Sequence, residues 1–173
     1  MFEKLISIFL GLLSFMPGMH ARGPLVVGER LPAHLTATTS QGKPYNFPAR
    51  GIVVLYFYPV SGTTHCTQQA CSLRDNFGEF KGFAEIVGVS YDSQEKQEAF
   101  KRANRLPFTL LSDTSRNLAH VFGANRTWVL DWAPKRMTFI IKDGILEKIF
   151  PDVDIRAHKN QILTEVRALL ESK

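Results

Sequence analysis

The sequence predicts one α/β domain, with a central mixed β-sheet flanked by helices and an amino-terminal β-hairpin. Segments with strand and helix character alternate from Gly28 onward in the order ββ-βαβαβα-ββ-α, which implies a mixed sheet with helices on both faces. The run at 52–57 is β-branched and aromatic throughout, typical of a strand covered on both faces. A chain of 173 residues with 45% apolar content can bury a single core.

The amino-terminal half is predicted from turn signals and from the period of its apolar residues. Asp92 is expected to cap a helix, because Glu95 follows three residues later and completes a capping-box pattern. The predicted elements are hairpin strands at 35–38 and 45–47 around the Gln41-Gly42 turn, a strand at 52–57, a helix from Cys66 to about Phe80, a strand at 85–90 and a helix ending near Ala103.

In the carboxyl-terminal half, Gly123 is expected to stop a short helix, and Asp143-Gly144 is a strong signal for a hairpin turn. The closing helix has one apolar stripe, formed by Ile162, Val166, Leu169 and Leu170. The predicted elements are a strand at 109–111, a helix at 116–122, hairpin strands at 137–141 and 145–150, and a helix at 157–170.

The amino terminus resembles a secretion signal. Residues 5–16 carry no charge and follow Lys4, as in the apolar region of a signal peptide; a membrane span needs about 20 apolar residues. We therefore predict a signal peptide or anchor at 1–21, cleaved after Ala21, and a domain at 22–173. The protein is expected to be periplasmic or otherwise exported. It would be cytoplasmic if Met19 were the true start, and sequencing the native amino terminus distinguishes the two.

The net charge of +5 does not predict a nucleic-acid partner. The 21 Lys and Arg residues are scattered, with only short pairs such as Lys101-Arg102. A binding surface for nucleic acid needs a basic patch or stripe, whereas a solvated surface of mixed charge accounts for this composition.

The two cysteines, Cys66 and Cys71, follow the strand at 52–57 and its loop. Cys66 falls in the first turn of the predicted helix, where backbone N–H groups and the helix dipole favour a thiolate. Cys66 is therefore the candidate nucleophile. Three functions are open: a thiol peroxidase, an exported thiol–disulfide oxidoreductase, or an exported binding module with structural cysteines. The C-x-x-x-x-C spacing argues against the second, because dithiol exchange enzymes use C-x-x-C.

Pro59, Thr63 and Cys66 stand in the spacing P-x-x-x-T-x-x-C. This is the active-site motif of peroxiredoxins, and the wider segment is similar to the peroxiredoxin Q or bacterioferritin co-migratory subfamily. Residues 87–92 (VGVSYD), 106–113 (LPFTLLSD) and 136–144 (RMTFIIKDG) also resemble family segments. The chain departs from many members in having Thr64-His65 in place of Pro-Gly, which bears on the rigidity of the loop.

The resemblance implies a thioredoxin-like fold and a thioredoxin-dependent peroxidase of the atypical two-cysteine type, reducing hydrogen peroxide and organic hydroperoxides. Cys66 would be the peroxidatic cysteine and Arg136 the guanidinium beside it, which stays charged and offers several donors. Thr63 would bring its hydroxyl to the thiolate and the peroxide oxygen, and Pro59 would shape the loop and shield the sulfur. No metal or organic cofactor is expected. The reductant would be a thioredoxin-like or glutaredoxin-like protein, and the protein a monomer.

Cys71 is predicted to be the resolving cysteine. Five residues along one helix separate two Cα atoms by roughly 8.7 Å, beyond the limit of about 7 Å for a disulfide without backbone movement. We expect the first turns to unwind before Cys71 attacks the sulfenic acid of Cys66. The alternative is a permanent structural disulfide. The polar residues that would let the helix melt are Thr67, Gln68, Gln69 and Ser72.

The other residues of the motif also have ordinary structural interpretations. Thr63 could be a helix N-cap, Pro59 a strand terminator, and Arg136 a surface residue at a strand end. The motif context favours the catalytic interpretation of Arg136, and the structural roles of Thr63 and Pro59 do not exclude catalysis.

His65 beside Cys66 suggests a base or a metal ligand. Two cysteines and one histidine make a poor zinc site, and the other histidines are not at a ligand spacing, so we expect neither role. Trp128 and Trp132 are expected to pack around the loop before Arg136; the alternative is an apolar rim for an organic peroxide.

Overall fold

The computed structural model describes residues 23–48, 50–127 and 131–172. The predicted signal peptide or anchor at 1–21 and the alternative start at Met19 lie outside the described residues, as does Trp128. Within the described ranges, no helix is both long and apolar enough to cross a membrane.

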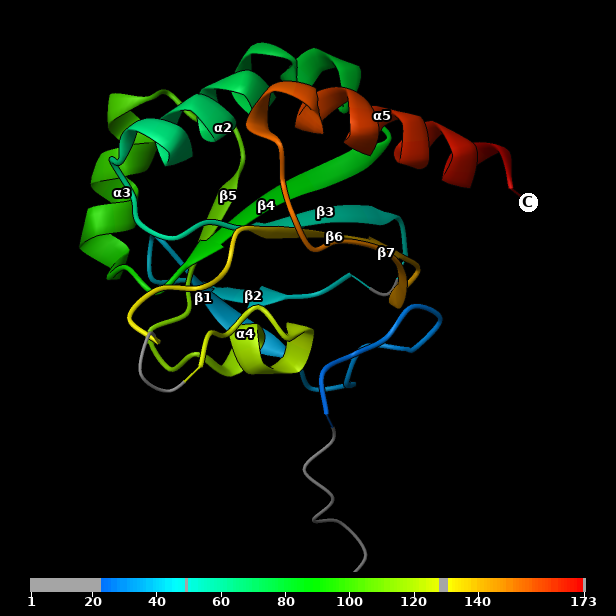
Figure 1. The fold of residues 1–173 in the computed structure, drawn as a ribbon, viewed down its shortest axis with the longest axis horizontal. Coiled ribbons are helices and arrows are strands. Elements are labelled where there is room, and N and C mark those ends of the chain that lie inside the picture. Colours follow the sequence, from blue (N-terminus) through cyan, green and yellow to red (C-terminus); the bar gives the residue numbers. More distant parts are fainter. Residues whose placement is uncertain (1–22, 49, 128–130, 173) are drawn as a thin grey trace, which may run out of the picture.

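In the described part of the chain, seven strands form one mixed sheet in the order β2-β1-β5-β4-β3-β6-β7 (Figure 1). β3 lies between β4, to which it is parallel, and β6, to which it is antiparallel. The predicted mixed sheet with an amino-terminal hairpin is confirmed. The strands are β1 (Thr36–Thr39), β2 (Pro44–Asn46), β3 (Ile52–Phe57), β4 (Ala84–Ser90), β5 (Thr109–Ser112), β6 (Met137–Lys142) and β7 (Ile145–Phe150).

Helices cover both faces of the sheet, as predicted. In Figure 1, α2 and α5 lie above the sheet and α4 lies below it. A short 3₁₀ helix, η1, follows α2. The bounds are α2 (Thr64–Asp75), η1 (Phe77–Glu79), α3 (Gln94–Ala103), α4 (Asn117–Phe122) and α5 (Ile155–Glu171).

Two apolar clusters form because side chains alternate across the sheet along each strand. Val53, Leu55 and Phe57 of β3 belong to the cluster that includes α4, whereas Val54 and Tyr56 belong to the one beneath α2 and α5. All residues of β3 are buried, which agrees with the strand covered on both faces that its sequence predicts. The second cluster positions the site, because Cys66 itself is one of its members. Its helical residues are Cys66, Ala70, Leu73, Phe100, Ile162, Leu163 and Val166.

The strand register brings three loops to one edge of the sheet. Phe57, the last residue of β3, pairs with Val89 near the end of parallel β4 and with Met137, the first residue of antiparallel β6. The loop after β3, the residues after β4 and the residue before β6 therefore meet. These segments contain the predicted motif, Asp92 and Arg136.

The helix predicted from Cys66 to Phe80 is shorter and begins earlier. α2 runs from Thr64 to Asp75, and Asn76 leaves the helical conformation with φ −110° and ψ 15°. The Asn76 side-chain amide donates to the Ser72 carbonyl at 2.8 Å, and such a local bond competes with continuation of the helix.

The prediction that Asp92 caps α3 was wrong. Ser93 is the N-cap, and its hydroxyl accepts from the Lys96 N–H at 3.3 Å. The Asp92 carboxylate instead accepts hydrogen bonds from Ser61 and Ser90, so a tertiary contact outweighs the capping pattern.

Two other helix predictions also need correction. α4 begins at Asn117, because Arg116 has a left-handed backbone with φ 62°. Leu170 of α5 is 40% exposed and does not join the core, because the last turns of α5 project beyond the sheet (Figure 1). The buried apolar residues of α5 are Ile162, Leu163 and Val166.

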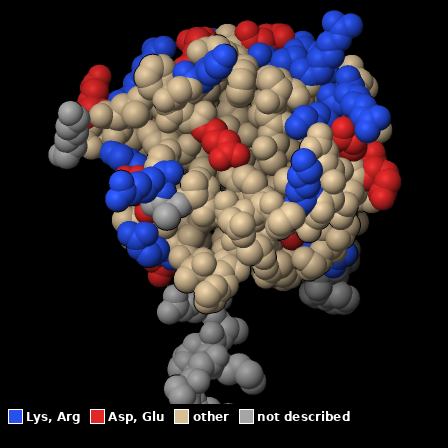
Figure 2. Space-filling view, turned by 180° about the vertical axis from the view of Figure 1, so that it is seen from behind, with Lys and Arg blue, Asp and Glu red and all other residues tan. Residues whose placement is uncertain are grey.

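The charge distribution agrees with a mixed surface. On the face that Figure 2 shows, basic side chains lie mostly toward the edges among acidic ones, and the centre is uncharged apart from an acidic group. This face therefore carries no continuous basic patch of the kind that nucleic-acid binding needs.

Candidate active site

Cys66 is the third residue of α2, which confirms its predicted place in the first turn. Thr63 takes the N-cap position with an extended backbone at φ −74° and ψ 151°, so the helix starts at Thr64. The first N–H groups of a helix have no intrahelical acceptor, and the positive end of its dipole lies there. Cys66 is 1% exposed. The sulfur therefore lies at the positive end of the helix dipole, with bulk water largely excluded.

Arg136 lies directly before β6 and contacts the sulfur. Its Nη2 donates to Cys66 Sγ at 3.2 Å, and its Nη1 donates to Gln69 Oε1. Cys66 and Gln69 are three residues apart and hence on one face of the helix. One guanidinium thus spans one turn of α2, holding a charged donor against the sulfur. The predicted placement of Arg136 beside Cys66 is confirmed.

Within residues 23–48, 50–127 and 131–172, no carboxylate forms an ion pair with Arg136. Gln69, which is 1% exposed, binds the guanidinium through a neutral amide. Gln69 therefore fixes the orientation of Arg136 and leaves its charge for the sulfur.

Thr63 and Pro59 lie in the loop before α2. The Thr63 hydroxyl donates to the Val60 carbonyl at 3.1 Å and makes no side-chain cap bond to the helix. Within the described part of the chain no hydrogen bond joins Thr63 to Cys66 Sγ, so the predicted contact is not formed in this state. Pro59 is half-buried after Tyr58, the residue that follows β3.

Cys71 is a half-buried free thiol on the same continuous helix as the free thiol Cys66. Its Sγ lies 3.7 Å from Asn104 Oδ1 at the end of α3. Arg74 Nη1 donates to the Asn104 carbonyl at 2.7 Å. The helical geometry of α2 keeps the two sulfurs too far apart for a disulfide without movement.

His158 of α5 lies behind the arginine. Its Nε2 and the Thr138 hydroxyl of β6 form a hydrogen bond of 2.9 Å. Burial of the imidazole, followed by the nearby charge of Arg136, lowers the pKa of His158 to about 4. His158 is therefore neutral at pH 7 and adds no second cation behind the site.

Trp132 does not pack as predicted. Its side chain is 66% exposed. The residues on either side of it, Asp131 and Ala133, make the inward contacts of this loop. The Asp131 carboxylate accepts from Arg116 at 3.1 Å, and Ala133 is fully buried. Trp132 therefore points outward. His65 is exposed on the first turn of α2.

The sequence predicts no role in the site for Gln69, His158 or Asp92. The polarity of Gln69 suggests only that it eases melting of the helix, although its spacing of three from Cys66 places both residues on the same helix face. Asp92 follows β4, at the edge where the loops meet. No local signal marks His158, because its position depends on how α5 docks.

A mixed α/β sheet that presents a buried cysteine at a helix start, with an arginine on the sulfur, defines a thioredoxin-like fold with a peroxiredoxin-type site. The family model for the AhpC/TSA family matches residues 27–149, and the chain belongs to that family. The predicted resemblance and fold are both confirmed.

Several curated relatives are peroxiredoxins. The chain is 36% identical over 124 residues to peroxiredoxin Q, chloroplastic, of Sedum lineare, a match that covers 69% of this chain and 66% of the relative. It is 33% identical over 117 residues to the putative peroxiredoxin bcp of Coxiella burnetii, covering 64% and 78%. The match to peroxiredoxin Q, chloroplastic, of Populus jackii covers only 51% of that protein. The chain thus spans about half to two thirds of the length of these chloroplastic relatives.

Solved structures show the same fold. Peroxidoxin BcpB from Mycobacterium tuberculosis superposes with a TM-score of 0.74 at 31% identity, covering 82% of this chain and 96% of that one. A Xanthomonas campestris peroxiredoxin Q structure gives 0.72 at 25% identity, with 79% and 91% covered.

Proposed function

We propose that the protein is a thiol-specific peroxidase that reduces hydrogen peroxide and organic hydroperoxides to water and alcohols, in antioxidant defence. The observation that carries this proposal is the contact of 3.2 Å between Arg136 Nη2 and the buried sulfur of Cys66. An arginine at this distance stabilises both a thiolate and the charge that develops on a departing oxygen.

In the first step, the Cys66 thiolate attacks the terminal peroxide oxygen and the O–O bond breaks. The sulfur loses two electrons and becomes a sulfenic acid, and the leaving oxygen takes a proton and departs as water or an alcohol. Arg136 stays charged and donates hydrogen bonds throughout. A rotation of the Thr63 hydroxyl away from Val60 would let it bind the peroxide.

In the second step, Cys71 attacks the Cys66 sulfenic acid, an S–S bond forms and water leaves. The first turns of α2 unwind for this attack. Unwinding breaks the bond of Gln69 to Arg136 and the contact of Cys71 with Asn104. Unwinding the helix at Gln69 therefore costs more free energy than the polarity of this residue suggests.

The carboxyl-terminal end of α2 is tied to two other helices. Arg74 binds the Asn104 carbonyl at the end of α3, and Lys159 of α5 contacts both Asn76 and Glu79. These contacts favour an unwinding that starts at Thr64 and stops before Arg74.

In the third step, a dithiol reductant of the thioredoxin-like or glutaredoxin-like kind returns the disulfide to two thiols, with the protein acting as a monomer. If segment 1–21 directs export, as its sequence predicts, this reductant lies outside the cytoplasm. The reaction uses no metal or organic cofactor, since the electrons come from sulfur.

The proposal is tested by mixing the reduced protein rapidly with one equivalent of hydrogen peroxide and mapping the oxidised sulfur by mass spectrometry. We expect fast, stoichiometric oxidation that starts as a sulfenic acid at Cys66 and ends as the Cys66–Cys71 disulfide. A thiol–disulfide oxidoreductase or a binding module would show slow, unselective oxidation of both cysteines, and that result would overturn the proposal.

A further inference from the structure

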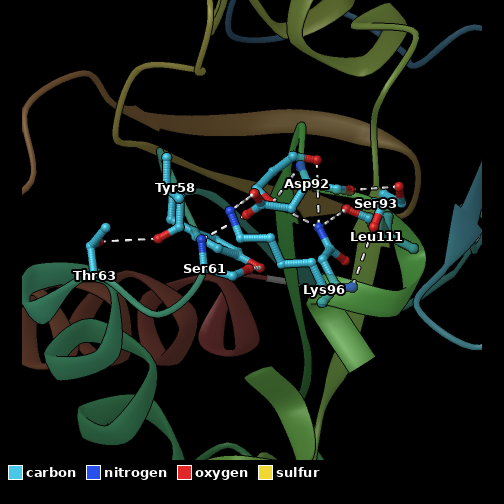
Figure 3. A network of polar contacts seen from close by, with 11 residues as sticks. Tyr58, Ser61, Thr63, Asp92, Ser93, Lys96 and Leu111 are labelled. Atoms are coloured by element: carbon cyan, nitrogen blue, oxygen red, sulfur yellow. Dashed lines mark hydrogen bonds and ion pairs between the residues drawn. The ribbon is translucent and has the colours of Figure 1, made fainter. Parts of the chain in front are cut away.

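A partly buried carboxylate, that of Asp92, holds the loop between β3 and α2 at its middle (Figure 3). Asp92 Oδ2 accepts from the Ser61 backbone N–H at 2.6 Å and from the Ser90 hydroxyl at 2.9 Å. The Asp92 side chain is 9% exposed. Ser61 precedes Thr63 by two residues and Cys66 by five, so this contact fixes the loop just before the reactive helix.

Asp92 is itself held in place by hydrogen bonds that involve β4, β5 and α3. Gln97, fully buried on α3, donates to the Ser90 hydroxyl at 2.9 Å and to the Leu111 carbonyl at 2.7 Å. The Ser112 hydroxyl donates to the Asp92 carbonyl at 2.7 Å. Asp92 is thus tied to β4, β5 and α3, none of which takes part in the unwinding of α2.

Asp92 is kept ionised at this position. Burial alone would raise the pKa of its carboxyl, but hydrogen bonds from Lys96, Ser61 and Ser90 outweigh burial and lower the pKa. The Lys96 ammonium lies 2.6 Å from Oδ1, on the exposed side of the carboxylate. The two carboxylate oxygens therefore have separate partners: Oδ2 holds the loop and Oδ1 faces the lysine.

The conformation of the loop after Ser61 depends on the hydrogen bond from the Ser61 N–H to Asp92. Ser61 Oγ lies 3.1 Å from the buried hydroxyl of Tyr58, and Gly62 has a left-handed backbone at φ 85°. The Thr63 hydroxyl binds the Val60 carbonyl. The position of Thr63 above the helix start thus follows from where Ser61 is held.

We propose that Asp92 is a positioning residue for peroxide reduction, which sets the place of Thr63 over Cys66 by holding the Ser61 N–H. This rests on the peroxidase function proposed above. Loss of the acceptor leaves the Ser61 N–H without its partner, and the loop then samples positions in which the Thr63 hydroxyl misses the peroxide. A displacement of about 1 Å in a reacting group costs up to roughly 100-fold in rate.

The test compares Asp92→Ala with Lys96→Gln, a matched control that removes the ion pair and keeps the acceptor for Ser61. A third variant, Asp92→Asn with Lys96→Gln, restores one acceptor oxygen without placing an amide against an ammonium group. Each protein is assayed for the rate of Cys66 oxidation by hydrogen peroxide, for the rate of Cys66 alkylation by iodoacetamide, and for the free energy of unfolding in urea.

We expect peroxide oxidation to fall roughly 10- to 100-fold in Asp92→Ala, to stay within about twofold of wild type in Lys96→Gln, and to recover mostly in the double variant. Alkylation needs no Thr63, so its rate should change little in all three. General loosening of α2 would instead speed alkylation, because Cys66 is buried.

The outcomes separate this inference from the function on which it rests. Slow peroxide oxidation in the wild-type protein would overturn the peroxidase itself. A fast wild-type reaction with an equally fast Asp92→Ala variant would overturn the role of Asp92 alone. A slowed variant whose alkylation rises and whose rate the double variant does not restore would show a merely structural role.

Discussion

At the scale of single residues, the site depends on the positive charge of Arg136, whose buried neighbours Gln69 and His158 are uncharged. Gln69 and His158 are both buried beside Arg136, and both are uncharged at pH 7. A glutamate in place of Gln69 would offer Arg136 a second anion and share its charge. The neutral amide instead orients the guanidinium and leaves the sulfur as the group that benefits from its charge.

Arg136→Met should lower the rate of Cys66 oxidation by roughly 100- to 1,000-fold, because it removes a charged donor aimed at the reacting atoms. Arg136→Lys should recover part of the rate, since a lysine cannot reach both Cys66 and Gln69 with one fork. Stopped-flow kinetics with hydrogen peroxide measures both. Arg167→Met, on the exposed face of α5, is the control, and a wild-type rate in Arg136→Met would remove Arg136 from the mechanism.

Gln69→Leu should slow oxidation about tenfold, because the guanidinium loses the acceptor that fixes it. Gln68→Leu changes the exposed neighbour on the same helix and should have little effect. Both rates are measured by competition for hydrogen peroxide with a second peroxidase. Equal rates in the two variants would show that Arg136 is held by other contacts.

At the scale of elements, the site is a meeting of strand ends with one helix that is fixed at one end. β3 and β4 are parallel and β6 is antiparallel to β3, so the loop after β3, Asp92 and Arg136 share an edge. α2 is tied at its carboxyl end to α3 and α5 through Arg74 and η1. Its first turns pack into the core through Cys66 and Ala70, and Cys66 and Gln69 accept hydrogen bonds from Arg136. This asymmetry is compatible with the proposed resolution step, in which the first turns open.

Cys71→Ser should still allow Cys66 to be oxidised to sulfenic acid, but recycling by a dithiol reductant should be abolished, because no intramolecular disulfide can form. Steady-state turnover with the reductant measures this. Undiminished turnover would refute the assignment of Cys71.

In the wild-type disulfide form, hydrogen exchange should speed up at Thr64–Ser72 and remain slow after Arg74.

Gly88→Ala should destabilise the fold by about 1–3 kcal/mol through overpacking. A Cβ at position 88 of β4 would lie 2.7 Å from the Tyr56 ring and from Leu110, both buried beneath α2. Gly78→Ala, where no atom lies within 4 Å of the added Cβ, is the matched control. Urea unfolding that gives the same free energy for both variants would contradict this account of the β4 packing.

At the scale of the whole molecule, the two clusters on either side of the sheet divide the structure. The α4 side is mostly apolar packing, including the amino-terminal residues Leu25, Leu31 and Leu35, with one buried carboxylate, Asp113, that accepts from N–H groups in the first turn of α4. The α2 and α5 side combines packing with buried polar groups, among them Gln69, Gln97, Thr138 and His158. Stability on this side therefore depends on the charge states of buried groups.

Between pH 6.5 and 4, wild-type stability should fall by about 3 kcal/mol through His158 alone. The unfolded chain binds a proton at this histidine below pH 6.5, whereas the folded protein does so only below about 4. Acid therefore favours the unfolded state. His158→Gln keeps a partner for Thr138 and should lack this component. Parallel unfolding curves for both proteins at pH 7 and pH 4.5 test it, and equal losses would contradict the shift.

The sequence by itself determined the order of elements, the buried β3, and the motif of Pro59, Thr63 and Cys66. These follow from apolar period, turn residues and motif spacing, which are properties of contiguous chain. The resemblance supplied Arg136, which lies 70 positions from Cys66.

Only the tertiary structure decided the partners. The capping pattern at Asp92 was overruled by a loop 31 residues away, and Gln69, expected to be a polar melting residue, became the buried support of Arg136. Trp132 was expected to pack around the loop before Arg136 and is 66% exposed. At Asp92 the local capping preference is worth about 1 kcal/mol, and the hydrogen bonds formed where distant strand ends meet outweigh it.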